Sequence, residues 1–445
     1  MPHVLCVSSE LPGMIYACVE LARRLRGAGH RVTFAAVPAA REIARHHGLD
    51  FVELELGRLG DFARDDAKVG YVRRLMTVKS RRQAAIDATG ADRFERFVRE
   101  LQPDLLLIDG EMHEQIIAAS ATGVPIALLN ALLSIWRRPG LPPPHHAVHP
   151  GVGIKGSAAG IGLLWAMLRG RKWWRLGRHR VRRAGCDRVA VLRGLAKRVG
   201  FDFRGEVDAS QWLIPFTYRR LPVLNARAIE FEFPHEPHPH VHYVGPMLLE
   251  ARIDRTDPAV RAELEDLFER RRRSGGERKL IYAGFGAYFS TEIALLRRLI
   301  AAVAERPDWD LVISLARGPE GLGELPNNVR TYAWVPQIDV LRNADLSVNH
   351  GGINTIDECV VYGVPMVIYT GAETDMKGAT ARAEHHEVGV SGDPRRDTPA
   401  TIRARMEHVM DTPRYAANIA RLRQSYARYI DDRVVERVVE SLLRG

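Results

Sequence analysis

Glycines and polar side chains gather within residues 334–376, and their types suit a nucleotide diphosphate. Gly351 and Gly352 follow an apolar stretch and let backbone N–H groups approach a ligand closely. A helix that begins there adds unsatisfied N–H donors and a partial positive charge, which together bind phosphate. His350 precedes the glycines and adds a charge-assisted donor for a phosphate oxygen. The segment therefore predicts a phosphate site at a strand-to-helix turn.

Neighbouring residues suit the remainder of a nucleotide. Asn354 and Thr355 place polar groups in the first helical turn, and Glu358, one turn later, can accept hydrogen bonds from ribose hydroxyls. Trp334 and Gln337 stand at the end of the preceding strand, where an indole stacks on a base and an amide reads its edge. The alternative is a glycine turn that only packs strand on helix, with Trp334 in the core. The ordered set over one strand–helix–strand unit favours the nucleotide site.

The same segment resembles the donor-binding signature of the UDP-glucuronosyl/UDP-glucosyl transferase family, in the natural-product branch of that family. Its pattern is W-x-P-Q, then H-G-G-x-N-S/T-x-x-E, then G-V-P-M, and an acidic residue followed by glutamine. The resemblance implies the two-domain GT-B fold and a UDP- or dTDP-sugar as co-substrate, with no other cofactor and no metal. It also implies that Asp375 binds sugar hydroxyls and that Gly286 faces the phosphates. Met376 replaces the family's glutamine, which is compatible with a deoxy sugar.

A second set of candidate residues lies near the amino terminus. The family places a histidine base in a Gly-His pair before the first helix, but this chain has Gly13-Met14, and methionine cannot accept a proton. Asp109, Glu10 and His113 are the candidate replacements, with Asp109 ranked first. A carboxylate reaches a suitable pKa by desolvation. The alternative is that Asp109 caps the following helix and that His113 lies on the surface.

These side chains need a scaffold of alternating strands and helices. The apolar runs are nearly continuous, which is typical of parallel strands buried on both faces. The fold class is therefore predicted as α/β, with two doubly wound Rossmann-like domains facing across a cleft at the strand carboxyl ends. The first series of strands is expected at 4–8, 31–36, 104–109, 126–130, 227–233 and 242–245, and the second at 279–283, 310–315, 329–333, 345–349 and 365–369.

The 445 residues are too many for one typical core, so two domains are expected. We expect an amino-terminal acceptor-binding domain over 1–250, with a basic helical insertion at about 136–220. A linker over 251–278 leads to a nucleotide-sugar domain over 279–425. A carboxyl-terminal helix over 426–445 is expected to pack back on the amino-terminal domain.

The insertion is rich in arginine and tryptophan over residues 165–183, and the chain carries a net charge of +10. We favour an amphipathic helix with Trp165, Trp173 and Leu176 packed inward and arginines in water. Peripheral contact of Trp165–Arg183 with an anionic membrane is the alternative. Nucleic acid is not expected, because no recognised module surrounds the cluster.

Other sequence features exclude several protein classes. The first residues enter a strand without a signal segment, and no apolar run is long enough to span a bilayer. Four scattered cysteines indicate free thiols in a reducing compartment, so a cytoplasmic protein is expected, with membrane association as the alternative. His145, His146 and His149 follow three prolines and are expected in a solvent loop rather than at a metal.

The resemblance predicts an inverting glycosyltransferase. It would move a sugar from a UDP- or dTDP-sugar to a hydroxyl of a hydrophobic small-molecule or lipid-like acceptor, using a base other than the usual histidine. The alternative is a non-catalytic homologue that binds a partner protein, which the methionine at position 14 suggests. A sugar-nucleotide epimerase is the third hypothesis, and the long apolar insertion disfavours it.

Overall fold

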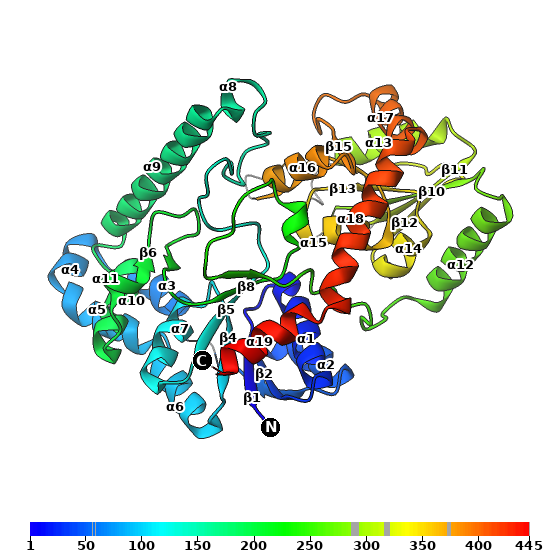
Figure 1. The fold of residues 1–445 in the computed structure, drawn as a ribbon. Coiled ribbons are helices and arrows are strands. Elements are labelled where there is room, and N and C mark those ends of the chain that lie inside the picture. Colours follow the sequence, from blue (N-terminus) through cyan, green and yellow to red (C-terminus); the bar gives the residue numbers. More distant parts are fainter. Residues whose placement is uncertain (56, 58, 286–292, 316–320, 372–374, 445) are drawn as a thin grey trace.

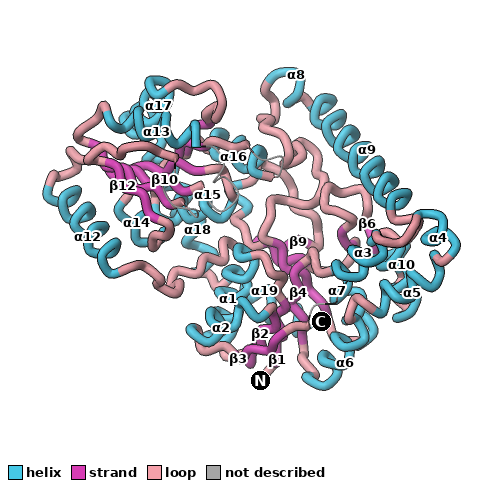
Figure 2. The backbone as a smooth tube through the Cα atoms, turned by 180° about the vertical axis from the view of Figure 1, so that it is seen from behind, coloured by secondary structure: helices cyan, strands magenta, loops and turns pink. Residues whose placement is uncertain are grey.

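The computed structural model describes residues 1–55, 57, 59–285, 293–315, 321–371 and 375–444. The chain forms two lobes, each built around a parallel sheet with helices on both faces (Figures 1 and 2). Gly286, expected at the phosphates, lies outside the described residues. The predicted α/β class with two doubly wound domains is confirmed.

The first sheet contains seven described strands in the order β3-β2-β1-β4-β5-β8-β9, all parallel. Its central strands β1 and β4 are buried along their whole length, because helices cover both faces. The strands are β1 (His3–Val7), β2 (Arg31–Ala36), β3 (Asp50–Glu53), β4 (Leu105–Asp109), β5 (Ile126–Asn130), β8 (Val223–Asn225) and β9 (Val241–Tyr243).

The helices of the first lobe come mostly from its amino-terminal half and from the insertion. A short antiparallel pair, β6 (Val207–Asp208) and β7 (Thr217–Tyr218), closes the insertion. The helices are α1 (Pro12–Gly27), α2 (Arg41–His46), α3 (Leu59–Ala67), α4 (Tyr71–Met76), α5 (Val78–Asp87), α6 (Ala91–Leu101), α7 (His113–Ala119), α8 (Gly153–Gly156), α9 (Ala158–Arg182), α10 (Arg188–Val199) and α11 (Phe203–Glu206).

The second sheet has six described strands in the order β12-β11-β10-β13-β14-β15, again all parallel. The strands are β10 (Lys279–Gly284), β11 (Trp309–Ser314), β12 (Val329–Tyr332), β13 (Leu346–Asn349), β14 (Met366–Ile368) and β15 (Gly389–Ser391). The helices in this part of the sequence are α12 (Pro258–Arg273), α13 (Ile293–Ala304), α14 (Gln337–Asn343), α15 (Ile353–Tyr362), α16 (Met376–His385), α17 (Pro399–Asp411), α18 (Pro413–Asp431) and α19 (Val434–Arg444).

The last two helices divide between the lobes. Helix α18 packs on α15 of the second lobe, whereas Val435 and Val439 of α19 lie in the core around α1 of the first lobe. Figure 1 shows α19, in red, beside α1 and α2. The chain passes from the second lobe to the first at Asp432–Arg433, where Arg433 has a φ of 49°. The boundary expected from the sequence was residue 425.

Two elements differ from those expected from the sequence. Helix α12 was expected to be part of the linker, but its Leu264 and Leu267 pack in the core of the second lobe. The strand expected over 227–233 is wrong, because the chain leaves the sheet after Asn225 and directs Arg227 and Glu232 to ion pairs with the second lobe. These ion pairs hold the lobes together where a strand would have pointed its side chains at neighbouring helices.

The insertion also differs from its expected packing. Trp165 of α9 is buried, but Trp173 is 55% exposed, so its expected inward packing is wrong. The histidine loop does not lie in solvent: the carbonyl of Pro144 accepts from the Gly378 amide at 2.8 Å, and His149 lies 3.2 Å from Glu384. Among the described helices, none has the length and apolarity needed to cross a bilayer.

Candidate active site

The strands of both sheets end at the junction of the lobes, and two adjoining cavities open there. The main cavity has a volume of about 530 Å³ and is lined from both lobes, with Asp109 on one side and Asn354 on the other. The side cavity, about 340 Å³, lies against Trp334 of the second lobe. The residues that line both cavities are Tyr16, Arg252, Gln337, His350 and Thr355.

The turn between β13 and α15 has the geometry of a phosphate site. Gly351 has a φ of 81°, and a Cβ there would lie 2.9 Å from Thr380 Oγ1, so only glycine fits. The Asn349 side chain accepts from the Gly351 amide at 2.9 Å and fixes the turn. Helix α15 then begins with Gly352 as its N-cap, which lines the main cavity. The first amides of α15 therefore face the junction of the two cavities.

His350 lies at this junction with a largely buried ring. Its Nδ1 is 3.5 Å from the carbonyl of Gly284, and burial lowers the pKa of His350. The imidazole is thus neutral at pH 7 until a ligand anion raises its pKa. In the free protein His350 is therefore a neutral hydrogen-bond donor, rather than the charged donor expected from the sequence.

Glu358 and Gln337, expected on the ribose and on the base edge, contact each other. The Gln337 amide donates to Glu358, and Tyr282 donates to the Gln337 carbonyl at 3.0 Å. Glu358 also accepts from the guanidinium of Arg252. The carboxylate is only 2% exposed, so these donors supply the partners that a buried charge needs.

Arg252 was not among the residues expected in the site. It lies in the segment between the lobes, stacks its guanidinium 5.0 Å from the centre of the Tyr16 ring and lines both cavities. The sequence places it at the start of a charged stretch, where nothing in its spacing separates it from solvent-exposed arginines. Its contact with Glu358 is the observation that places Arg252 in the site.

Trp334 lies on the wall of the side cavity and is 41% exposed. The alternative that places it in the core is therefore wrong. An indole that keeps one surface open at the end of β12 is available to stack on a planar ring.

Asn354 faces the first lobe. Its side-chain oxygen accepts from Arg227 at 2.6 Å, and Arg227 also pairs with Asp357, with both side chains buried. Gly13, at the start of α1, approaches so closely that a Cβ there would lie 2.4 Å from the Asn354 amide nitrogen. Thr355 lines both cavities. Helices α1 and α15 therefore begin against each other.

Two of the carboxylates that line the main cavity each have an oxygen that lacks a hydrogen-bond partner among the described residues: Oδ2 of Asp109 and Oδ2 of Asp375. Asp109 is 1% exposed, and its Oδ1 accepts from the Glu111 amide at 3.0 Å. Burial raises the pKa of Asp109, and the hydrogen bond from the Glu111 amide partly offsets the rise. Burial also raises the pKa of Asp375. Such oxygens suit ligand hydroxyls.

The other two candidates for the base lie elsewhere. His113 is fully buried in the first turn of α7, where its Nδ1 is 3.1 Å from the Tyr218 hydroxyl and its ring packs on Phe216. It is neither in the main cavity nor on the surface, because α7 turns its first residue into the core. Glu10 is exposed and faces a third cavity of about 490 Å³. Met14 does line the main cavity, as an apolar side chain.

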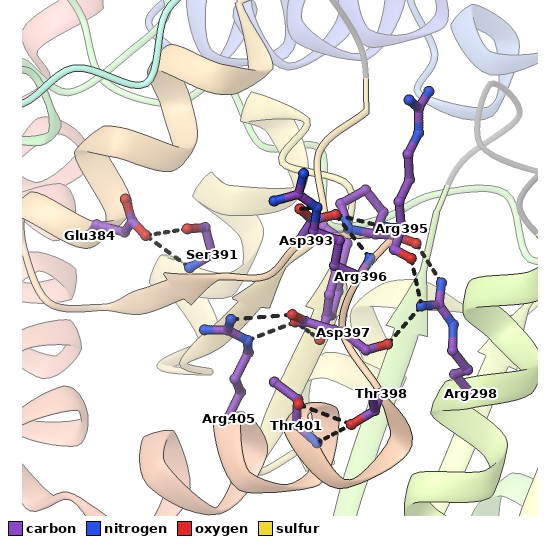
Figure 3. A network of polar contacts seen from close by, with 12 residues as sticks. Arg298, Glu384, Ser391, Asp393, Arg395, Arg396, Asp397, Thr398, Thr401 and Arg405 are labelled. Carbon is purple, nitrogen blue, oxygen red and sulfur yellow. Dashed lines mark hydrogen bonds and ion pairs between the residues drawn. The ribbon is translucent and has the colours of Figure 1, made fainter.

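A polar network around Asp397 holds together the segment between β15 and α17 (Figure 3). Asp397, which precedes α17, accepts from Arg405 at 2.7 Å and from the Tyr369 hydroxyl at 3.1 Å. Arg298 of α13 donates to the carbonyl of Asp397 at 2.7 Å. Tyr369 directly follows β14, so the network also anchors the carboxyl end of that strand.

Apolar side chains form much of the remaining wall of the main cavity, including Leu128, Ile135, Leu213 and Leu248. Within the described ranges, no three histidine, cysteine or acidic side chains are grouped to hold a metal ion. The arrangement can bind an anion at α15, a planar ring at Trp334, and a largely apolar molecule beside Asp109.

Residues 297–441 match the protein family described as the carboxyl-terminal domain of erythromycin biosynthesis protein CIII-like proteins. Oleandomycin glycosyltransferase of Streptomyces antibioticus is 37% identical over 97 residues, which is 21% of this chain and 23% of that protein. The 4'-demethylrebeccamycin synthase of Lentzea aerocolonigenes is 31% identical over 198 residues, 44% of each chain. The matched segments thus span less than half the length of either relative.

Solved structures resemble the whole chain, among them the following two. The glycotransferase of kitacinnamycin has a TM-score of 0.68 and 20% identity, with coverage of 100% of this chain and 99% of the other. The glycosyltransferase VinC in complex with dTDP has a TM-score of 0.64 and 20% identity, with coverage of 99% and 98%. These likenesses show that the two lobes form the GT-B fold expected from the sequence.

Proposed function

We propose that this chain, a homologue of natural-product glycosyltransferases with the GT-B fold, transfers a sugar from a UDP- or dTDP-sugar to a hydroxyl of a hydrophobic acceptor. One observation carries the proposal: the amino terminus of α15 meets the carboxylate of Asp109 across one cavity, and Oδ2 of that carboxylate has no hydrogen-bond partner among the described residues. A diphosphate leaving group and an acceptor hydroxyl would thereby lie on opposite sides of the same sugar. Natural-product glycosyltransferases among the relatives support this assignment.

Each part of the donor has its own place in the two cavities. Its base stacks on Trp334 in the side cavity, with its edge toward Gln337. Its ribose hydroxyls reach Glu358, and its diphosphate lies at Gly352 and His350, where the cavities join. The related VinC structure contains dTDP, which supports a pyrimidine diphosphate here.

Arg252 supplies a positive charge that the family signature does not contain. Its guanidinium borders both cavities, so it lies beside the position proposed for the diphosphate. Together with the amides of α15, it stabilises the negative charge that develops as the nucleoside diphosphate departs. Asn354 and Thr355 line the same end of the main cavity.

The transfer step uses Asp109 as the general base. The ionised Oδ2 accepts the proton of the acceptor hydroxyl while that oxygen forms a bond to the anomeric carbon. The bond from that carbon to the diphosphate oxygen breaks on the opposite side, and its electron pair leaves with the nucleoside diphosphate. The product is a glycoside of inverted configuration. Asp375 accepts hydrogen bonds from hydroxyls of the sugar.

The apolar wall opposite α15 defines the acceptor class. Leu128, Ile135 and Leu213 come from the first lobe and its insertion, and they favour a largely apolar small molecule or lipid-like acceptor. Met14 extends this wall at the position of the missing histidine.

Binding and transfer are tested separately. Calorimetry with dTDP and with UDP measures nucleotide binding, and chromatography of reactions with dTDP- and UDP-sugars and a hydrophobic aglycone measures glycoside formation. We expect binding of at least one nucleotide, and transfer that His350→Ala strongly reduces. Absence of binding by both nucleotides would instead favour the non-catalytic, partner-binding homologue. Unchanged kinetics of His350→Ala would remove the donor site from this location.

A further inference from the structure

The outer side of α9 carries an apolar stripe that the proposed function does not use. The inner side of this helix buries Ile161, Trp165 and Lys172. On the outer side the large apolar side chains are 45–64% exposed, which is unusual for four residues on one helix. We define the α9 stripe as Leu163, Met167, Trp174 and Val181.

Helical geometry places the α9 stripe on one line opposite the buried face. With 3.6 residues per turn, its four members fall within about 40° of one another and extend over about 27 Å. Gly170 and Gly177 lie on the same line, and no heavy atom lies within 4 Å of the place where either would carry a Cβ. The stripe is therefore unobstructed along its length.

A row of arginines runs beside the stripe on the same helix: Arg171, Arg175, Arg178 and Arg182, all exposed. The Arg178 guanidinium lies 4.8 Å from the centre of the Trp174 ring, so charge and apolar surface meet directly. Among the described residues, no carboxylate pairs with these four arginines, although arginine pairs are frequent elsewhere in the chain. The row thus retains its full positive charge for an anionic partner.

Exposed apolar side chains continue beyond both ends of α9. Ile154 of α8 is 89% exposed at one end, and Val72 and Met76 of α4 are 67% and 77% exposed at the other. Arg74 of α4 donates to the carbonyl of Arg182 at 3.1 Å, which fixes α4 at the end of α9. In both views α8, α9 and α4 follow one another along one outer edge of the first lobe (Figures 1 and 2).

We propose that this edge docks on an anionic lipid bilayer, with α9 lying parallel to the surface. The apolar side chains of the stripe enter the boundary between headgroups and acyl chains, Trp174 lies at the headgroup level, and the arginines contact lipid phosphates. A second copy of this chain is disfavoured, because it would bring two arginine rows together. An acidic protein helix is disfavoured because the exposed residues extend over three helices and line none of the three cavities.

Co-sedimentation with vesicles tests the proposal directly. We expect the protein to bind vesicles of equal parts phosphatidylcholine and phosphatidylglycerol, and not vesicles of phosphatidylcholine alone. Met167→Gln/Trp174→Gln should lower the partition coefficient by about tenfold, because apolar burial drives insertion. Each of Arg171→Gln and Arg175→Gln should lower it by about fivefold, the effect of one basic residue near an anionic surface.

Ile430→Gln is the matched control, because Ile430 is 59% exposed on α18, away from this edge. It should bind vesicles as the unmodified protein does. Unchanged thermal unfolding and nucleotide binding of every variant would show that the fold is retained. The proposal is overturned if the unmodified protein does not bind anionic vesicles, or if Met167→Gln/Trp174→Gln binds them as well as the unmodified protein does. It is also overturned if this double variant abolishes only a protein–protein association.

Discussion

Arg252, which lines both cavities, donates to Glu358, so a residue between the lobes neutralises a carboxylate buried in the second lobe. The side chain of Glu358 is only 3% exposed, whereas that of Arg252 is 23% exposed. The guanidinium therefore keeps one side open toward the proposed position of the diphosphate. The pair links the shape of the donor site to the segment that connects the lobes.

Arg252→Met should weaken the binding of dTDP or UDP by about 10- to 150-fold, because hydrogen bonds to charged groups contribute about 1.5–3 kcal/mol. The binding of thymidine or uridine, which lack phosphates, should change by less than about threefold under the same reasoning. Calorimetry measures both. Arg261→Met is the control, since Arg261 lines the side cavity but pairs with Asp254. Tighter binding by Arg252→Met would mean instead that Arg252 blocks the ribose site.

Trp334→Ala should weaken nucleotide binding by about 5- to 150-fold, because stacking of a base on an aromatic ring is worth about 1–3 kcal/mol. Trp334→Phe should retain most of the affinity. Thermal unfolding should be unaffected in both, since the indole is already 41% exposed. Trp173→Ala, a tryptophan of similar exposure in the first lobe, should bind nucleotide normally. Equal affinities for all three variants would place the base elsewhere.

Asp109→Asn should reduce kcat by about 100-fold or more, the usual contribution of a general base, while dTDP binding is retained. Only the ionised carboxylate accepts a proton, and burial raises the pKa of Asp109. The kcat of the unmodified enzyme should therefore fall as the pH decreases through a value above the usual pKa of aspartate, about 3.9. Undiminished turnover of Asp109→Asn would assign the base to another group.

The same substitution should make the protein more stable at neutral pH. A pKa raised in the folded state means that the folded protein binds the proton more tightly than the unfolded chain does. Stability is therefore lost as the pH rises from the unfolded pKa through the folded one, and the ionised side chain is unfavourable at pH 7. A higher Tm for Asp109→Asn in calorimetry would agree, and exposed Asp65→Asn should leave Tm unchanged. A lower Tm would indicate a structural carboxylate.

Arg227→Met should destabilise the protein by about 3–5 kcal/mol, because it leaves Asp357 as an unpaired buried charge. Asp357 also accepts from the Tyr426 hydroxyl at 2.8 Å, which cannot replace the lost positive charge. The double variant Arg227→Met/Asp357→Leu should recover most of the loss. Chemical denaturation measures these changes, with the exposed pair Arg255–Glu42 as the control, where Arg255→Met should cost less than about 1 kcal/mol.

The sequence predicted the second lobe well because its local signals agree. Gly351 and Gly352 mark a turn that only glycine can make, and the strands on either side are continuous apolar runs. Trp334, Gln337, His350 and the first turn of α15 therefore came together as expected. Asp109 was also placed correctly beside the main cavity, because a strand end fixes its direction.

Contacts between distant segments were not predictable in the same way. Arg227 and Arg252 resemble the many surface arginines of this chain until the fold sets each against a carboxylate more than a hundred residues away. His113 is a polar residue in a glycine-containing stretch that is typical of a loop, yet the direction of α7 places its side chain in the core. Helix periodicity likewise did not separate Trp165 from Trp173, because both sides of α9 are apolar.

The crossing of the chain at Asp432–Arg433 bears on how such proteins are recombined. Helix α19 is encoded with the second lobe but contributes Val435 and Val439 to the core of the first. A chimera made by one junction near residue 250 would seat a foreign α19 on the native α1 and mismatch that core. Exchange of donor specificity by module grafting therefore requires two junctions, one before α12 and one between α18 and α19, so that each grafted module keeps the side chains it evolved to pack.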